Sequence, residues 1–96
     1  MQLRQSPRAS ADLDSIYEYG AANYGTRAAL AYIEGIEQRF RLLLDHPRSG
    51  RMDDALLSGL LSIPSGSHRI FYRIDGDTIT IQRILHMAAD ARRWLS

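Results

Sequence analysis

Two stretches in the C-terminal half of the chain constrain its fold most strongly, because together they predict a β-hairpin. Residues 66–74 and 78–86 both mix isoleucine with polar side chains in short alternating runs. The dipeptide Asp75-Gly76 lies between them and is typical of a type I′ two-residue turn. An isolated hairpin is marginally stable in water, so the rest of the chain is expected to supply a scaffold for it.

Alternation along the two strands predicts which side chains share a face of the sheet. The first strand places one set on one face: Ile70, Tyr72 and Ile74. It places another set on the opposite face: Arg69, Phe71 and Arg73. In the second strand one face carries Ile79, Ile81, Arg83 and Leu85, and the other carries Thr80, Gln82, Ile84 and His86. We expect the Ile70 face to meet helices and the Arg69 face to stay free for a partner.

The first half of the chain predicts a short strand at residues 2–5 and two helices. Ser6 is a good N-cap before Pro7, and Gly25 suits the C-terminal end of that first helix. Its apolar stripe is Leu13, Ile16, Tyr17, Gly20, Ala21 and Tyr24, and Asp12, Asp14 and Glu18 are expected on the opposite, solvent-facing side. The second helix, capped by Thr26, has the stripe Ala29, Ile33, Ile36, Phe40, Leu43 and Leu44. It is expected to end near residues 45–46, because Pro47 disfavours helical geometry in the residue before it.

The complete order of elements predicts an α+β fold. A polar connector over residues 47–54 precedes a strand at about residues 60–63, and a short helix is expected at about residues 88–94. The resulting arrangement is β-α-α-β-β-β(-α), with an αα-hairpin packed on a small, mainly antiparallel sheet. With 96 residues the chain is expected to form a single domain over residues 1–96.

Composition excludes several classes of function. There is no cysteine, which rules out disulfides and thiolate zinc sites. All twelve basic residues are arginine, so a catalytic lysine is excluded, and the net charge of +1 gives no bulk attraction to nucleic acid. The apolar runs are too short for a membrane span, and the N-terminal residues lack the apolar core of a signal peptide. We expect a cytoplasmic protein without a metal or cofactor.

Two groups of residues invite a chemical or binding interpretation. His68, His86, Tyr72 and nearby arginines resemble the parts of a ribonuclease site, with a histidine as general base and arginines stabilising the phosphorane. The alternative is that each histidine ends a strand and is solvated or bonded to backbone. At the C-terminal end, Arg92, Arg93 and Trp94 suit an anchor for a protein partner. The alternative there is that Trp94 folds back over the sheet.

Several motifs in this order resemble one known family. The matching segments are Ser6-Pro7, residues 11–16, Tyr19, Tyr24-Gly25, residues 46–51, residues 66–73 and residues 81–86. In length and order of motifs the chain resembles ParE, the toxin of bacterial type II toxin–antitoxin modules, within the RelE/ParE superfamily. The Gly-Ser-His…Phe-Tyr-Arg and Arg-Ile-Leu-His segments at this separation carry most of the resemblance.

The resemblance implies a function through protein contact. ParE-like proteins are not known as enzymes; they poison DNA gyrase and are neutralised by a ParD-like antitoxin. No direct binding to nucleic acid or membrane is implied. One alternative is a RelE-like, ribosome-dependent mRNA interferase, although the segment from Met87 to Ser96 lacks the tyrosine typical of that branch. A second is a degenerate, non-toxic antitoxin-binding partner, because Leu57 and Leu61 replace arginines of many relatives.

On this basis no catalytic, cofactor-binding or metal-binding residue is assigned. The expected contacts with a partner are Arg69, Phe71, Arg73, Arg83, His86, Arg92, Arg93 and Trp94.

Overall fold

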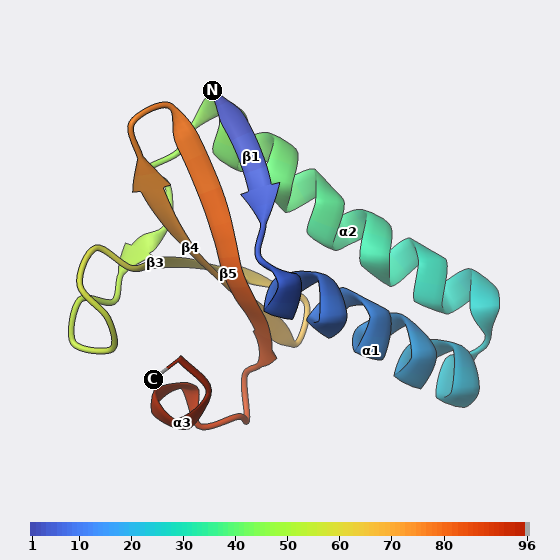
Figure 1. Ribbon diagram of the computed structural model, residues 1–96. Coiled ribbons are helices and arrows are strands. Elements are labelled where there is room, and N and C mark those ends of the chain that lie inside the picture. The colour runs from blue at the N-terminus through green and yellow to red at the C-terminus, as the bar shows by residue number, and fades with distance from the viewer. Residues whose placement is uncertain (96) are drawn as a thin grey trace.

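A five-stranded mixed sheet carries two long helices on one face and a short C-terminal helix on the other (Figure 1). The computed structural model describes residues 1–95. Its elements in chain order are β1 Gln2–Gln5, α1 Pro7–Tyr24, α2 Thr26–Asp45, β2 Arg51–Met52, β3 Leu61–Ser65, β4 His68–Asp75, β5 Thr78–His86 and α3 Ala91–Leu95. The strand order is β1-β5-β4-β3-β2, with β1 parallel to β5 and all other pairs antiparallel. The predicted α+β arrangement is confirmed, with β2 as an additional strand.

The helical hairpin begins and turns close to the positions that the sequence predicts. The Ser6 hydroxyl accepts the Ala9 N–H at 3.0 Å, and Pro7 occupies the first helical position, where no intrahelical N–H is needed. Gly25 joins the helices with a φ of +92°, a backbone conformation that a residue with a Cβ adopts at a cost. Thr26 was expected to cap α2, and that prediction is wrong: Gly25 is the N-cap and no side chain caps the helix.

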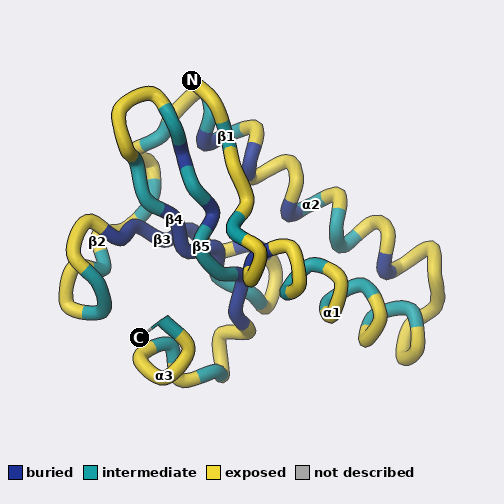
Figure 2. Tube along the Cα trace, viewed as in Figure 1, coloured by how far each residue is buried: buried dark blue, intermediate teal, exposed yellow. Residues whose placement is uncertain are grey.

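The main hydrophobic core lies between α2 and the facing side of the sheet (Figure 2). Ile36 and Leu43 of α2 have no exposed surface, and neither has Tyr72 of β4. Burying a side chain of this size contributes about 1.5–3 kcal/mol, so this layer is the principal source of stability. The core members are Ala9, Ile36, Phe40, Leu43, Leu61, Ile63, Ile70, Tyr72, Ile79, Ile81 and Ile84. The Ile70 face therefore meets the helices, as predicted.

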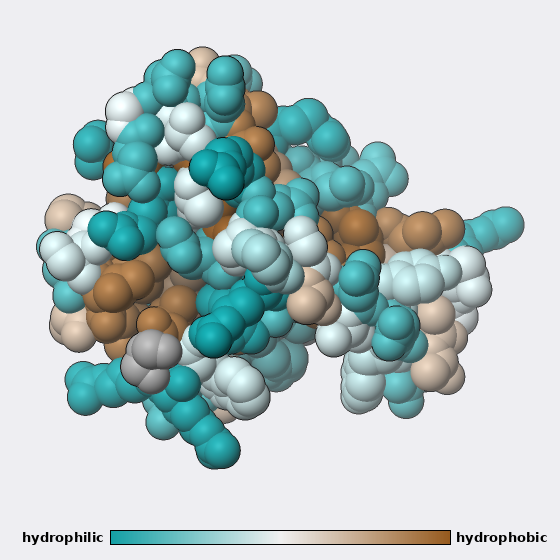
Figure 3. Space-filling model, viewed as in Figure 1, coloured by the Kyte–Doolittle hydropathy of each residue, from teal (hydrophilic) through white to brown (hydrophobic). Residues whose placement is uncertain are grey.

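The opposite face of the sheet is covered, which corrects the expectation that it stays free. Phe71, expected to contact a partner, is only 3% exposed and packs with Leu60 and Leu85 in a second cluster. The cover comes from the loop over residues 53–60 and from α3. Partly buried side chains around it are Leu56, Leu57, Ala89, Ala91 and Leu95. In Figure 3 apolar side chains gather between this loop and the C-terminal end.

A β-bulge changes which side chains of β5 face the helices. Phe71 pairs with Arg83 but Tyr72 pairs with Ile81, so Gln82 is an extra residue without a partner on β4. Beyond the bulge the alternation reverses. Ile84 consequently lies in the main core, and Arg83 and Leu85 do not share the face of Ile79 and Ile81 that simple alternation predicts.

The turns and edges differ in detail from the expectations. The β4–β5 turn has Gly76 and Asp77 at its centre, and among its residues only Gly76 has a positive φ, of 61°. That pattern fits a type II′ turn, and the type I′ prediction is wrong because type I′ needs a positive φ at both central positions. β3 continues through Pro64 to Ser65, beyond the predicted end at residue 63. None of the helices in residues 1–95 has both the length and the apolar composition of a membrane span.

Candidate functional site

A cleft of about 630 Å³ opens between the helical hairpin and the ends of β4 and β5 that carry His68 and His86. The helices contribute the rings of Tyr19, Tyr24 and Tyr32, and the strands contribute the two histidines. The rest of its lining is Ser15, Ile16, Gly20, Ala28, Ala29 and Ser67. Tyr19 and Tyr24 are 66% and 72% exposed. The walls are therefore largely aromatic and apolar, and Tyr24 lies in the cleft instead of the core that its helical spacing predicts.

Tyr32 is the residue that ties the cleft to the hairpin. Its hydroxyl lies 2.5 Å from Nδ1 of His68 and accepts the Ser67 N–H at 2.9 Å. The ring packs on Gly66, where a Cβ would come within 2.7 Å of it, and Gly66 also has a φ of +58°. Both observations explain why the turn before β4 has glycine at this position. Tyr32 was missed by the sequence analysis, because its side chain falls beside the apolar stripe of α2.

The two histidines form a pair across β4 and β5. His68 and His86 are directly opposite in the register, and their rings meet edge to face at a centroid distance of 5.3 Å. Burial lowers the pKa of the His68 imidazole below its ordinary value, and His86 lowers it further, whereas Asp12 acts in the opposite direction. Nδ1 of His86 accepts the Ala88 N–H at 3.0 Å. A neutral imidazole is favoured at His68, which can accept a proton or a hydrogen bond.

The other parts of a ribonuclease site do not join this pair. Tyr72 lies in the core, where its hydroxyl donates to the Pro47 carbonyl at 2.7 Å and accepts the Gly50 N–H at 3.0 Å. Burial raises the pKa of this hydroxyl, so it stays protonated. Among the described residues that line the cleft there is no arginine. The geometry gives a base without the cation that would stabilise a pentacovalent phosphate.

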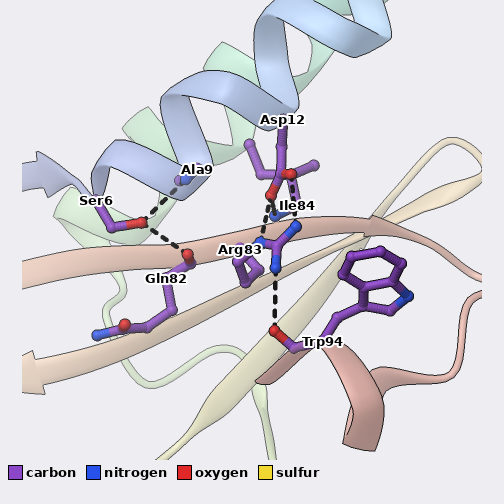
Figure 4. A network of polar contacts seen from close by, with 7 residues as sticks. All are labelled: Ser6, Ala9, Asp12, Gln82, Arg83, Ile84 and Trp94. Carbon is purple, nitrogen blue, oxygen red and sulfur yellow. Dashed lines mark hydrogen bonds and ion pairs between the residues drawn. The ribbon is translucent and has the colours of Figure 1, made fainter. Parts of the chain in front are cut away.

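Arg83 joins β5 to α1 and to the C-terminal helix through hydrogen bonds, which Figure 4 shows. Its Nε and one terminal nitrogen each donate to Asp12 of α1 at 2.8 Å, and the other donates to the Trp94 carbonyl at 3.0 Å. Asp12 also accepts the Ile84 N–H at 2.9 Å, so it satisfies part of the β5 edge that β1 leaves uncovered. The hydrogen bond to Asp12 raises the pKa of Arg83 against the opposing effect of burial. The prediction that Asp12 lies on the solvent-facing side of the helix is wrong, because its side chain is only 14% exposed.

The remaining residues expected to contact a partner are divided between two places. Arg69 and Arg73 of β4 are partly buried on the sheet face that α3 covers. The α3 side chains Arg92, Arg93 and Trp94 are exposed, and Trp94 keeps 46% of its surface. The guanidinium of Arg83 lies 5.6 Å from the Trp94 ring and that of Arg93 lies 5.8 Å from it. The C-terminal helix therefore folds back on the sheet and still presents its tryptophan to solvent.

The arrangement and the sequence together agree with one family. The family model described as "ParE toxin of type II toxin-antitoxin system, parDE" matches residues 3–91. The chain belongs to the ParE toxin family. It is 37% identical over 92 residues to Toxin ParE1 of Caulobacter vibrioides, covering 96% of this chain and 95% of that protein. It is thus a ParE-type toxin of a type II toxin–antitoxin system.

Solved structures show the same fold in complexes of toxins with antitoxins. The structure titled as the chromosomal ParDE system of P. aeruginosa superposes with a TM-score of 0.77 at 26% identity, covering 90% of this chain and 95% of that one. A chain in the RelBE2 toxin–antitoxin complex of Mycobacterium tuberculosis has a TM-score of 0.50 at 28% identity, covering 88% of this chain and 95% of that one. The ParE toxin thus shares its architecture with the wider RelE/ParE superfamily.

Proposed function

We propose that this ParE-type toxin acts in the cytoplasm by binding DNA gyrase, without catalysing a reaction itself. Membership of the ParE family supports gyrase as the target. The proposal that the toxin does not catalyse a reaction rests on the composition of the cleft. Its two histidines face aromatic and apolar walls, and no arginine is among the described residues that line it. A site for phosphodiester cleavage needs a cation beside the base, because the transition state accumulates negative charge.

We further propose that the apolar cleft receives a segment of a ParD-like antitoxin. The support is the exposure of Tyr19 and Tyr24 on the walls of a cleft of about 630 Å³. Large exposed aromatic side chains around a concave site are typical of binding surfaces. An amphipathic antitoxin segment that buried these rings would gain free energy from their apolar area.

Plasmid topology in cells tests the proposed target. Inducing the toxin without its antitoxin should stop growth and leave plasmid DNA relaxed, because gyrase no longer introduces negative supercoils. Growth arrest with fully supercoiled plasmid would contradict gyrase as the target. Continued growth with soluble, folded protein present would support the degenerate, non-toxic alternative, in which Leu57 and Leu61 replace functional arginines. The structure places Leu61 in the main core at 6% exposure.

A matched pair of variants tests whether the antitoxin binds in the cleft. Tyr24→Asp places a charge in the cleft, and Leu30→Asp places one on an exposed position of α2 that does not line the cleft. We expect Tyr24→Asp to escape neutralisation by the co-expressed antitoxin and Leu30→Asp to be neutralised like the unsubstituted toxin. Equal neutralisation of both variants would place the antitoxin elsewhere.

The mRNA interferase alternative has one observation in its favour, the pair of histidines inside a cleft. It predicts that His68→Gln abolishes toxicity and that primer extension on cellular mRNA finds new cuts after induction. The gyrase proposal predicts no such cuts and a toxic, folded His68→Gln variant. The two accounts therefore give opposite results in the same pair of measurements.

A further inference from the structure

The hydroxyl group of Tyr32 determines which ring nitrogen of His68 carries the proton. Its oxygen accepts the backbone N–H of Ser67 at 2.9 Å, so the hydroxyl proton remains to be donated. Of the acceptors within reach, Nδ1 of His68 lies at 2.5 Å, the Ser65 carbonyl at 3.3 Å and the Ser67 hydroxyl at 3.4 Å. The shortest contact assigns the proton to Nδ1, because hydrogen bonds weaken as the distance grows. Nδ1 is then an acceptor, and a neutral His68 carries its own proton on Nε2.

The neighbouring histidine has the same tautomer for an independent reason. Nδ1 of His86 accepts the backbone N–H of Ala88 at 3.0 Å, and a backbone amide nitrogen can only donate. A neutral His86 therefore also carries its proton on Nε2. Each imidazole of the pair thus has Nδ1 occupied by a donor of the protein and an Nε2–H group left over.

Nε2 of His68 is accessible from outside the protein. Among the described residues that are not exposed, Nε of Arg69 is the buried side-chain nitrogen without a hydrogen-bond partner. Nε2 of His68 has no partner within residues 1–95 either, so it must retain solvent-accessible surface. Because His68 lines the cleft of about 630 Å³, a molecule in the cleft can reach this N–H. The accessible nitrogen is therefore a donor, and it cannot act as a general base in this state.

The walls of the cleft favour an uncharged acceptor for this donor. A carboxylate placed there would lose its hydration, and no arginine is among the described residues that line the cleft. Burying an anion without a cation is costly. Burial lowers the pKa of His68, so the imidazole does not supply the missing charge near neutral pH. An uncharged carbonyl oxygen fits better, because it accepts an N–H bond while its apolar neighbours pack on the aromatic walls.

We propose that Tyr32 is a positioning residue, which holds His68 with its Nε2–H ready to bind an uncharged carbonyl oxygen of the antitoxin segment. The inference rests on the proposed function, in which that segment occupies the cleft. Aromatic walls contribute affinity with little directionality, whereas a few fixed polar groups determine how a bound molecule is oriented. The Tyr32–His68 pair would therefore set the register of the antitoxin segment in the cleft.

Nitrogen-15 NMR of histidine-labelled, antitoxin-free toxin tests the positioning role. Ring nitrogens with and without a proton have well-separated shifts, and the His68 signals are assigned by their loss in His68→Gln. Above neutral pH we expect a protonated Nε2 and an unprotonated Nδ1. Tyr32→Phe, which keeps the ring that packs on Gly66, should increase the fraction with Nδ1 protonated. Tyr17→Phe, on α1 outside the cleft lining, should leave the His68 signals unchanged.

Two results would overturn the positioning role. One is a His68 ring that is mainly protonated on Nδ1 in the unsubstituted toxin, and the other is a tautomer that Tyr32→Phe does not change. The same spectra of the complex with the antitoxin test the kind of acceptor. A neutral His68 with a protected Nε2–H supports an uncharged carbonyl, and a doubly protonated ring at neutral pH would show a carboxylate instead.

Calorimetric titration with the complete ParD-like antitoxin tests the donor. A glutamine amide places an N–H near the position of Nε2, whereas an asparagine amide lies near the position of Nδ1. We expect His68→Gln to bind within about threefold of the unsubstituted toxin and His68→Asn about tenfold more weakly, since the carbonyl then lacks its donor. Circular dichroism checks that both variants are folded. Equal affinities of the two variants would overturn the donor role.

Tyr24→Asp in the same titration distinguishes this inference from the proposed function. Weaker binding by Tyr24→Asp, with equal binding by the two His68 variants, would leave the antitoxin in the cleft and overturn only the donor. Unchanged binding by Tyr24→Asp would place the antitoxin elsewhere and overturn both. The tautomer of His68 in the free toxin is independent of either outcome.

Discussion

Removing the carboxylate of Asp12 should destabilise the toxin more than any substitution at an exposed charge. Asp12→Ala deletes two hydrogen bonds to Arg83 of 2.8 Å each and the acceptor of the Ile84 N–H at 2.9 Å. The side chains of Arg83 and Asp12 are only 13% and 14% exposed, so water replaces these bonds poorly. The substitution therefore leaves a nearly buried guanidinium without its counter-ion.

The expected magnitude follows from these contacts. Breaking a buried ion pair by removing one partner costs about 3–5 kcal/mol, and the residual exposure places this case near the lower limit, about 3 kcal/mol. Asp12→Asn keeps an acceptor for the Ile84 N–H but loses the charge, and we expect roughly half of that loss. A double-mutant cycle with Arg83→Met should give a coupling free energy of about 2 kcal/mol.

Urea denaturation followed by far-ultraviolet circular dichroism measures these changes. Fluorescence is unsuitable, because Trp94 lies against Arg83 and would respond locally. With a slope of about 1 kcal/mol per molar urea, Asp12→Ala should lower the midpoint by about 3 M. Arg51→Gln is the control: the Arg51 side chain is 60% exposed in its ion pair, and we expect a loss below about 0.5 kcal/mol. A loss below about 1 kcal/mol for Asp12→Ala, or a coupling near zero, would refute this account of Arg83.

Three further predictions concern the hairpin. Gly66→Ala should cost about 1–2 kcal/mol, because the φ of +58° is strained for alanine and its Cβ displaces Tyr32; an unchanged urea midpoint would contradict this. Because burial lowers the pKa of His68, the folded state binds a proton less readily than the unfolded state, so stability should fall as the pH drops below about 6.5. Urea midpoints measured against pH should show a shallower fall in His68→Asn than in the unsubstituted toxin, and equal slopes would argue against the buried, neutral histidine. Phe71→Ala should cost about 3–5 kcal/mol in the same assay, and a loss below about 1 kcal/mol would mean that the covered face is open.

The sequence predicted the order of elements well because local signals specify each of them. Ser6-Pro7 marks the start of α1, and Pro47 follows the end of α2 at Asp45. The bounds predicted for β1 and β5 agree with the structure. Each signal acts within a few residues, through capping or through the fixed φ of proline. Of the strands, only β2 was missed, because two residues are too few to show alternation.

The features that were missed depend on contacts between distant segments. The bulge at Gln82 has no local signature, yet it exchanges the faces of Arg83 and Ile84. Asp12 was assigned to solvent because nothing in α1 shows that Arg83, 71 residues further along the chain, approaches it. Tyr32 joins the site through hydrogen bonds to Ser67, in the turn before β4, and to His68, the first residue of β4. His68 lies 36 residues further along the chain than Tyr32. Helical periodicity reports how apolar a face is, and it carries no information about polar partners.

The hairpin that most resembles a family signature is chiefly a structural element. Gly66 gives room to Tyr32, Phe71 and Tyr72 occupy the two hydrophobic clusters, and Arg83 joins β5 to α1. Sequence reasoning grouped Tyr72 with the histidines because they are neighbours in the motif. The structure separates them along the strand: His68 and Tyr72 share the face that meets the helices, but they are four positions, about 13 Å, apart along β4, and the core takes the Tyr72 side chain.

DNA supercoiling by purified gyrase tests the central claim most directly. Relaxed plasmid, gyrase and ATP are incubated with increasing amounts of the toxin, and with the same amounts of toxin already bound to its antitoxin. We predict a dose-dependent loss of supercoiling with free toxin, and normal supercoiling with the complex. Full supercoiling at saturating free toxin, with no cleaved DNA after the protein is denatured, would contradict the claim that this ParE-family chain acts on gyrase.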